Sequence, residues 1–284
     1  MKPLFSIDLT NDKNNLIMNG TEFTVATPSD MLHQRLEKSI DEADEVVEQA
    51  KLPLVLTILQ AICGVVGVAI VAGAIESLDG LSLKEMYQRA PWLFWVGAGC
   101  ILGCLAIHFL GKGKAKAVLD TDESANTFSK LSSVKDAIFT ELSVPASAKE
   151  VDVLAFFYKV KNGGIKVCHN ALQTAQYFNS AYKIYTDDEK FYVVNLEAKH
   201  AFPLSSLRGI QTVNKRVVAD EWNKEERYNK GIYKQYRIST TKQGDITYKG
   251  YHILELELSG ELYGIYFPAY ELSAFEEVTG LKAE

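Results

Sequence analysis

Two long apolar stretches in the first half of the chain dominate its pattern of hydrophobic and polar residues. The first, Leu52 to Ile75, holds 24 residues without a charge, and the second runs from Trp92 to Leu110. The hydrocarbon core of a bilayer is about 30 Å thick, and a helix needs roughly 20 apolar residues to cross it. The pattern therefore predicts transmembrane helices at about 52–77 and 91–110, joined by a short polar loop.

Before the first span, small and apolar residues recur every three or four positions, which is the spacing of a heptad seam. These positions are Leu36, Ile40, Ala43, Val47, Ala50 and Leu54. Pro28-Ser29-Asp30 is a helix-start signal, so we expect one long helix from about 29 to 77, with Pro53 as the point where it can kink. A solvated single helix with a chance stripe is the alternative interpretation.

A helical pattern returns from about 120 to 142, with Phe128, Leu131, Ile138 and Leu142 on one face. We expect this helix to pair antiparallel with the helix before the first span. Residues 29–142 would then form a two-helix transmembrane hairpin with a helical cytoplasmic stalk. Residues 1–28 alternate weakly on either side of Asn19-Gly20, which predicts either a β-hairpin or a flexible tail.

Basic residues near the spans predict the orientation of the hairpin. Lys112, Lys114 and Lys116 follow the second span directly, whereas the loop between the spans contains only Lys84 and Arg89. Because Lys and Arg near span ends are enriched on the cytoplasmic side, we predict a multi-pass membrane protein with both termini in the cytoplasm. Neither apolar stretch, Leu52 to Ile75 or Trp92 to Leu110, contains Asp, Glu, Lys or Arg. This disfavours a transporter, whose pathway normally requires ionisable groups at mid-membrane.

Small residues at four-residue spacing occur in both spans: Cys63 and Gly67 in the first, Gly99 and Gly103 in the second. Small residues allow the close backbone approach by which membrane helices associate. We interpret these four as helix-packing candidates within the hairpin. Packing against the helices of a partner is one alternative, and the general frequency of Gly in membrane helices is another.

After residue 150 the pattern is that of short strands. Eight β-branched or aromatic runs are separated by turn residues, and Ser259-Gly260 between the last two runs indicates a tight hairpin. Tyr270–Leu281 has helical spacing, with Gly280 as its stop. Residues 150–284 are therefore predicted to form a small antiparallel β barrel or curled sheet with a carboxy-terminal helix, and the fold class is α+β.

Two stretches of this domain carry a family resemblance. FYVVNL from Phe191, followed by HAFPLSSLRGI from His200, resembles the strand-and-turn pattern of pleckstrin-homology-like (PH-like) domains in bacterial membrane proteins. The final PAYELSAFEEVTGL resembles their carboxy-terminal helix. The layout of two spans followed by such a domain is similar to that of uncharacterised two-span bacterial membrane proteins. The resemblance implies a location in the bacterial cell membrane and a binding or scaffolding role, without catalytic residues.

A basic segment within this domain is a second candidate contact surface. The net charge of the chain is −6, yet residues 199–242 carry ten basic and four acidic side chains. The candidates for contact with anionic lipid headgroups or a partner protein are Lys215, Arg216, Lys224, Arg227 and Lys230, together with the three lysines after the second span. A solvated loop explains the same composition. Nucleic acid would select similar residues, but membrane tethering and an acidic total lead us to predict none.

Motifs for catalysis and metal binding do not occur. The cysteines and histidines lack zinc-ligand spacing, and the sequence has no GxSxG, Walker or GxGxxG motif. We therefore predict no enzyme, metal or cofactor. The first hypothesis is a membrane-anchored, cytoplasm-facing interaction or scaffold protein that contacts lipid headgroups, a membrane-protein partner or a second copy. The alternative is an accessory subunit of a membrane transport or envelope-synthesis complex.

Overall fold

The computed structural model describes residues 1–10, 18–77, 87, 91–162, 164–167, 182–220, 235–236, 238–240 and 245–284. The chain divides into two compact units. The helical unit is Gln34–Lys135, and the β unit combines Met1–His33 with Asp136–Glu284. The fold is α+β, as the sequence predicts.

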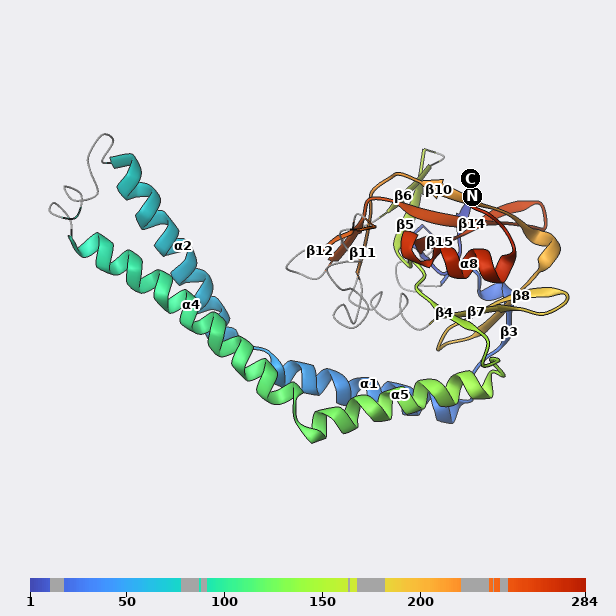
Figure 1. The fold of residues 1–284 in the computed structure, drawn as a ribbon, viewed down its shortest axis with the longest axis horizontal. Helices are drawn as coiled ribbons and strands as arrows, with labels where there is room; N and C mark the ends of the chain where they lie inside the picture. The colour runs from blue at the N-terminus through green and yellow to red at the C-terminus, as the bar shows by residue number, and fades with distance from the viewer. Residues whose placement is uncertain are drawn as a thin grey trace. The chain divides into compact units, whose positions relative to one another are not determined.

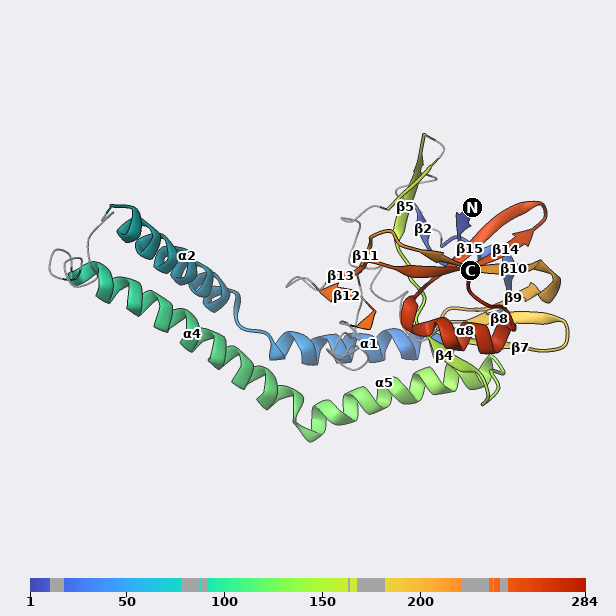
Figure 2. The same cartoon turned by 45° about the horizontal axis from the view of Figure 1, so that its top comes forward.

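Four long helices account for most of the helical unit and its connections to the β unit. They are α1 (Asp30–Ala50), α2 (Leu54–Ser77), α4 (Pro91–Leu119) and α5 (Asp122–Glu141). α2 and α4 run side by side in both views, and so do α1 and α5 (Figures 1 and 2). The chain therefore runs out along α1 and α2 and returns along α4 and α5.

The facing sides of α1 and α5 carry buried residues at heptad spacing. On α1 these are Leu36, Ser39, Ala43 and Ala50, and on α5 they are Ser124, Thr127, Leu131 and Val134. Residues three and four apart share one face of a helix, so each set forms a continuous stripe. The predicted seam is right at Leu36, Ala43 and Ala50. Ile40 and Val47 are only half-buried, and the prediction is wrong at Leu54, which is exposed.

The predicted helix boundaries are wrong at two places. The expected continuous helix from 29 to 77 is interrupted, because α1 ends at Ala50 and α2 begins at Leu54 with a bend of 45°. Pro53 explains the break, since proline has no N–H and its ring clashes with the carbonyl four residues earlier. In the other direction, α4 continues past the predicted end at 110 to Leu119. The three lysines after the second span therefore lie on the helix itself.

Two larger sheets form the framework of the β unit. One has the order β3 (Thr24–Ala26), β9 (Lys199–Pro203), β8 (Lys190–Val194), β7 (Tyr182–Thr186) and β4 (Lys149–Val151). The other has the order β1 (Lys2–Pro3), β15 (Glu261–Pro268), β14 (Tyr251–Leu258) and β10 (Leu207–Val213). Their apolar residues form one core that includes Tyr182, Phe191, Phe202, Leu254 and Phe267.

Two three-stranded sheets complete the β unit. One pairs β2 (Ile7–Asp8), β5 (Phe157–Lys161) and β6 (Gly164–Val167), and the other pairs β11 (Val217–Asp220), β13 (Asp245–Tyr248) and β12 (Ile238–Thr240). Every described strand pair within the carboxy-terminal domain is antiparallel, as predicted. The two parallel pairs, β1 with β15 and β2 with β5, join the domain to the amino-terminal segment. The predicted barrel is wrong, because the described strands form four separate sheets that do not close on one another.

The carboxy-terminal hairpin and helix follow the sequence prediction. β14 and β15 pair antiparallel, and Ser259 and Gly260 between them have φ of 53° and 80°. These are the positive angles that a two-residue hairpin turn requires. The last helix, α8 (Leu272–Thr279), lies across the strands (Figure 1), and the ring of Phe275 stacks on Phe267 with centroids 3.8 Å apart.

The amino-terminal segment is a structural part of the β unit, and the sequence did not predict this. Leu4 and Phe5 are fully buried in the main core, and β1, β2 and β3 each pair with a strand from beyond residue 150. A short antiparallel bridge joins Ile7 to Met18, so part of the predicted fold-back exists. Three strands this short carry too little pattern to show that they add to distant sheets.

His200 on β9 links this segment to the sheet. The residue is 3% exposed, and its Nδ1 lies 3.3 Å from the Oγ1 of Thr24. The ring of Phe5 packs against the imidazole with centroids 4.9 Å apart. Burial lowers the pKa of His200 to about 4, and a hydrogen bond to the backbone of Gly20 only partly opposes this shift.

Acidification is expected to destabilise the β unit through His200. The pKa falls from the ordinary 6.5 to about 4 on folding, so between these values the unfolded chain binds a proton that the folded chain does not. The stability contributed by the neutral imidazole is complete above pH 6.5 and is lost as the pH falls toward 4, by about 3 kcal/mol in total.

Urea unfolding of the full chain in detergent, followed by the tyrosine circular dichroism, measures this loss between about pH 7.5 and about pH 5. The variant His200→Asn should reduce the pH dependence by about 2 kcal/mol. The control His33→Gln, at a side chain that is 41% exposed, should leave it unchanged. Equal pH dependence of the wild type and His200→Asn would contradict the assignment.

Candidate functional site

The contact between α2 and α4 is close and includes several small residues. Gly67 on α2 is buried, and a Cβ placed there would lie 3.3 Å from both the Cβ of Cys100 and the Cγ1 of Ile101 on α4. A Cβ placed at Gly103 would lie 4.0 Å from the Sγ of Cys63. The absence of a side chain at Gly67 therefore allows the two backbones to approach closely.

The structure brings three of the four predicted helix-packing residues to this contact. Cys63, Gly67 and Gly103 lie at the α2–α4 contact, whereas Gly99 is exposed and a Cβ there would meet no atom within 4 Å. The buried glycine in this part of α4 is Gly97. Four-residue spacing fixes which residues share a face but not which face the neighbouring helix covers, so the sequence could not separate Gly99 from Gly97.

Most of the large apolar side chains described on α2 and α4 are exposed. Residues more than 60% exposed include Leu54, Val55, Val65, Trp95, Leu102 and Phe109. By length and composition, the described residues contain one helix able to cross a membrane, Trp95–Leu119 within α4. A second candidate exists if the bent pair Asp30–Ala50 and Leu54–Ile70 counts as one span. Soluble monomers rarely expose contiguous apolar patches of more than a few hundred Å².

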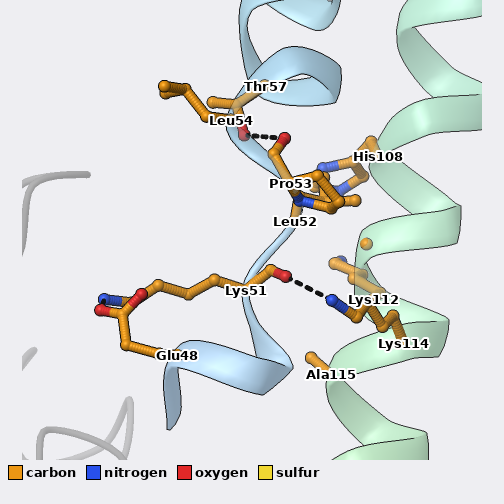
Figure 3. Close-up of a pocket in the computed structure, with 11 residues that line it drawn as sticks. Glu48, Lys51, Leu52, Pro53, Leu54, Thr57, His108, Lys112, Lys114 and Ala115 are labelled. Atoms are coloured by element: carbon orange, nitrogen blue, oxygen red, sulfur yellow. Dashed lines mark hydrogen bonds and ion pairs between the residues drawn. The ribbon is translucent and has the colours of Figure 1, made fainter. Parts of the chain in front are cut away.

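Hydrogen bonds at the break between α1 and α2 start α2 and join the break to α4. The carbonyl of Pro53 accepts the N–H groups of Leu56 and Thr57, so Pro53 lies at the start of α2, where a missing N–H leaves no bond unmade. The Nζ of Lys114 donates to the carbonyl of Lys51 over 2.9 Å, as the dashed line in Figure 3 marks. The last carbonyls of a helix have no hydrogen-bond donor within the helix, and Lys114 supplies one here.

Gly111 on α4 leaves room for the side chain of Leu52 where the break approaches that helix. A Cβ at Gly111 would lie 2.7 Å from the Cδ1 of Leu52, which is closer than the two atoms can come. Gly111 therefore allows Leu52, in the middle of the break, to lie directly against α4. The sequence shows this glycine only as part of a lysine-rich exit, and no pattern in it indicates the contact.

A groove of about 800 Å³ lies beside the break, lined by both α2 and α4 (Figure 3). Its polar lining consists of Glu48, Lys51, His108, Lys112 and Lys114. Its less polar lining consists of Leu52, Pro53, Leu54, Thr57, Gly111 and Ala115. Glu48 and Lys51 form an ion pair. Counting three lysines against one glutamate gives the lining a net charge of +2 with His108 neutral, and Lys112 and Lys114 carry this excess.

The predicted basic contact residues fall into three groups. Lys112 and Lys114 line the groove, whereas Lys116, on the same helix, is exposed outside it. Lys215 and Arg216 are exposed in the β unit between β10 and β11. Lys224, Arg227 and Lys230 lie outside the described residues. The structure therefore assigns a shaped site to two of the predicted lysines, and adds Lys51 and His108, which the sequence analysis did not select.

A signal for these added residues exists in the sequence. A helix break at Pro53 and a lysine cluster after the second span lie at the same end of a hairpin, and together they place polar groups beside an interrupted helix.

Among the described residues, no cluster of three or more His, Cys, Asp or Glu could hold a metal ion. Comparisons with protein-family models, with curated proteins and with solved structures find no match for this chain.

Substitution of Gly67 by leucine is expected to separate α2 from α4. A side chain there must displace Cys100 and Ile101, and overpacking of this kind costs about 1–3 kcal/mol. Thermal unfolding of the helices in detergent, followed by circular dichroism, should show a lower midpoint for Gly67→Leu. The matched control is Gly73→Leu in the same helix, where an added Cβ would meet no atom within 4 Å. Equal losses in both variants would argue against a close contact at Gly67.

Proposed function

We propose that this chain is a two-span membrane protein that carries a PH-like interaction module on the cytoplasmic side. The observation that carries the proposal is the exposed apolar surface of α2 and α4, on residues such as Val65 and Leu102. Burial of apolar surface is worth roughly 25 cal/mol per Å², so in water this surface would favour aggregation. A bilayer would remove this apolar surface from water, and each helix would keep its backbone hydrogen bonds within itself.

The distribution of lysines supports an orientation with both termini in the cytoplasm. Lys112, Lys114 and Lys116 lie at the end of the hairpin from which α1 and α5 continue. Lysines near span ends are retained on the cytoplasmic side. The β unit would then face the cytoplasm, since it is continuous with α1 and α5.

The connection from β4 to β5 supports the PH-like assignment. At Val151 the chain pairs with Tyr182 of β7 in one sheet, and the N–H of Leu154 then donates to the carbonyl of Tyr266 on β15 in the other sheet. One segment thus contributes to both larger sheets, and α8 covers their shared core through Phe275. By resemblance, such modules bind and scaffold, and we propose a non-enzymatic role for this chain. Its ligands would be lipid headgroups or a protein partner.

Reporter fusions to the intact chain test the topology. A reporter active only in the cytoplasm should give full signal at the carboxy terminus and no signal when inserted in the loop between α2 and α4, because the lysines hold that end of the hairpin inside. An export-dependent reporter should give the opposite pattern. Signal from the export reporter at the carboxy terminus would overturn the proposal.

Exposure of Gly99 favours a second candidate function, the accessory subunit of a membrane transport or envelope-synthesis complex. An exposed glycine on a span leaves room for the helix of another protein. Gly99→Leu should then abolish co-purification of a membrane partner, while the α2–α4 contact remains intact because Gly99 takes no part in it. Retention of the same partners by Gly99→Leu would argue against the subunit function.

A further inference from the structure

The groove beside the helix break combines two kinds of surface that few ligands match together. Lys112 and Lys114 give it the excess positive charge described above. Leu52 and Leu54 give it an apolar side, and Leu54 is 73% exposed. A ligand that uses both needs a negative group joined to a hydrocarbon chain.

The partners of the three lysines in the groove indicate where a negative group would bind best. Lys51 already has a carboxylate partner in Glu48. The partner of Lys114 is the uncharged carbonyl of Lys51, so this bond holds the ammonium group in place and leaves its charge unbalanced. Lys112 lies two residues away on the same helix and forms no ion pair with any described residue. Because both lysines line the groove, their two charges would attract a phosphate group that is bound there.

The position of the groove selects among the possible phosphate compounds. If α2 and α4 cross the membrane, as proposed above, the groove lies where the apolar spans meet the lysine-rich helix end, at the depth of lipid headgroups. Its volume of about 800 Å³ is within the usual range of small-molecule sites, about 300–1,000 Å³. A phospholipid whose acyl chain lies along Leu54 and the outer face of α2 therefore fits better than a soluble phosphate compound.

We propose that this groove binds the phosphate headgroup of one anionic phospholipid of the inner leaflet, with Lys112 and Lys114 contacting the phosphate. The proposal rests on the proposed membrane-spanning function and adds a specific site to it. It differs from general attraction between lysines and an anionic bilayer, which would treat Lys112, Lys114 and Lys116 alike. Binding in the groove would depend on Lys112 and Lys114 and not on Lys116, because Lys116 does not line the groove.

Native mass spectrometry of the full chain in detergent, with phosphatidylglycerol or phosphatidylcholine added, tests the site. The wild type should retain one phosphatidylglycerol in preference to phosphatidylcholine. The double variant Lys112→Gln/Lys114→Gln should bind phosphatidylglycerol about 30-fold more weakly, which corresponds to the usual contribution of two lysines near an anionic headgroup. The double variant Lys112→Arg/Lys114→Arg should retain the lipid, because guanidinium groups also bind phosphate.

The matched control is Lys116→Gln/Lys130→Gln, which removes the same charge at two exposed lysines outside the groove. It should change the affinity less than twofold, and circular dichroism should show unchanged helix content in all variants. Equal weakening by the two glutamine double variants would overturn the proposal in favour of general attraction. Displacement of the lipid by inorganic phosphate would also overturn it, because the site would then recognise a free anion.

Failure of this inference is distinguishable from failure of the proposed function. Extraction of the wild type from membranes by alkaline carbonate would contradict the two-span anchor itself. Resistance to carbonate, together with equal retention of phosphatidylglycerol and phosphatidylcholine, would leave the anchor in place and contradict only the headgroup site.

Discussion

Close packing of α2 on α4 through small residues is the main physical constraint in the helical unit. Two helices that meet through Gly67, Cys63 and Gly103 bury little apolar surface against each other, so nearly all their large apolar side chains must find another environment. We propose that a bilayer takes up these side chains, because a helix keeps all its backbone hydrogen bonds there. In the β unit, by contrast, apolar side chains such as Phe5, Phe191 and Phe267 are buried in the unit's own core.

The second constraint is the difference between the two sides of the hairpin. Pro53 interrupts the outgoing chain, while the returning helix α4 passes the same level without a break and continues to Leu119. The interrupted helices α1 and α2 lie beside the continuous helix α4, and a groove lies next to the break. Leu52 packs at Gly111 of α4, and Lys114 of α4 donates a hydrogen bond to the carbonyl of Lys51. The charged residues of α4 thus face an opened backbone at the end of the apolar segment, where a lipid phosphate would lie.

Features encoded by local patterns could be predicted from the sequence, and features that depend on distant contacts could not. The apolar helices, the heptad positions Leu36 and Ala43, the Ser259-Gly260 turn and the end of α8 at Gly280 each follow from a few neighbouring residues. Insertion of Leu4 and Phe5 into a core built mainly from residues beyond 150 depends on pairing across the whole chain. For the same reason, Lys112 and Lys114 could be predicted as contact residues only from their charge. The groove that distinguishes them from Lys116 depends on how the chain runs between α1 and α2, which the sequence pattern does not show.

Amide hydrogen exchange of the full chain in lipid nanodiscs tests whether α2 and α4 span the bilayer. All four long helices carry the same backbone hydrogen bonds, so differences among them report access of water. If α2 and α4 span the bilayer, the segments 56–70 and 96–107 should exchange far more slowly than the segments 36–50 and 122–134 of α1 and α5. Exchange at similar rates in all four segments would show that water reaches α2 and α4, and would contradict the membrane-spanning hairpin.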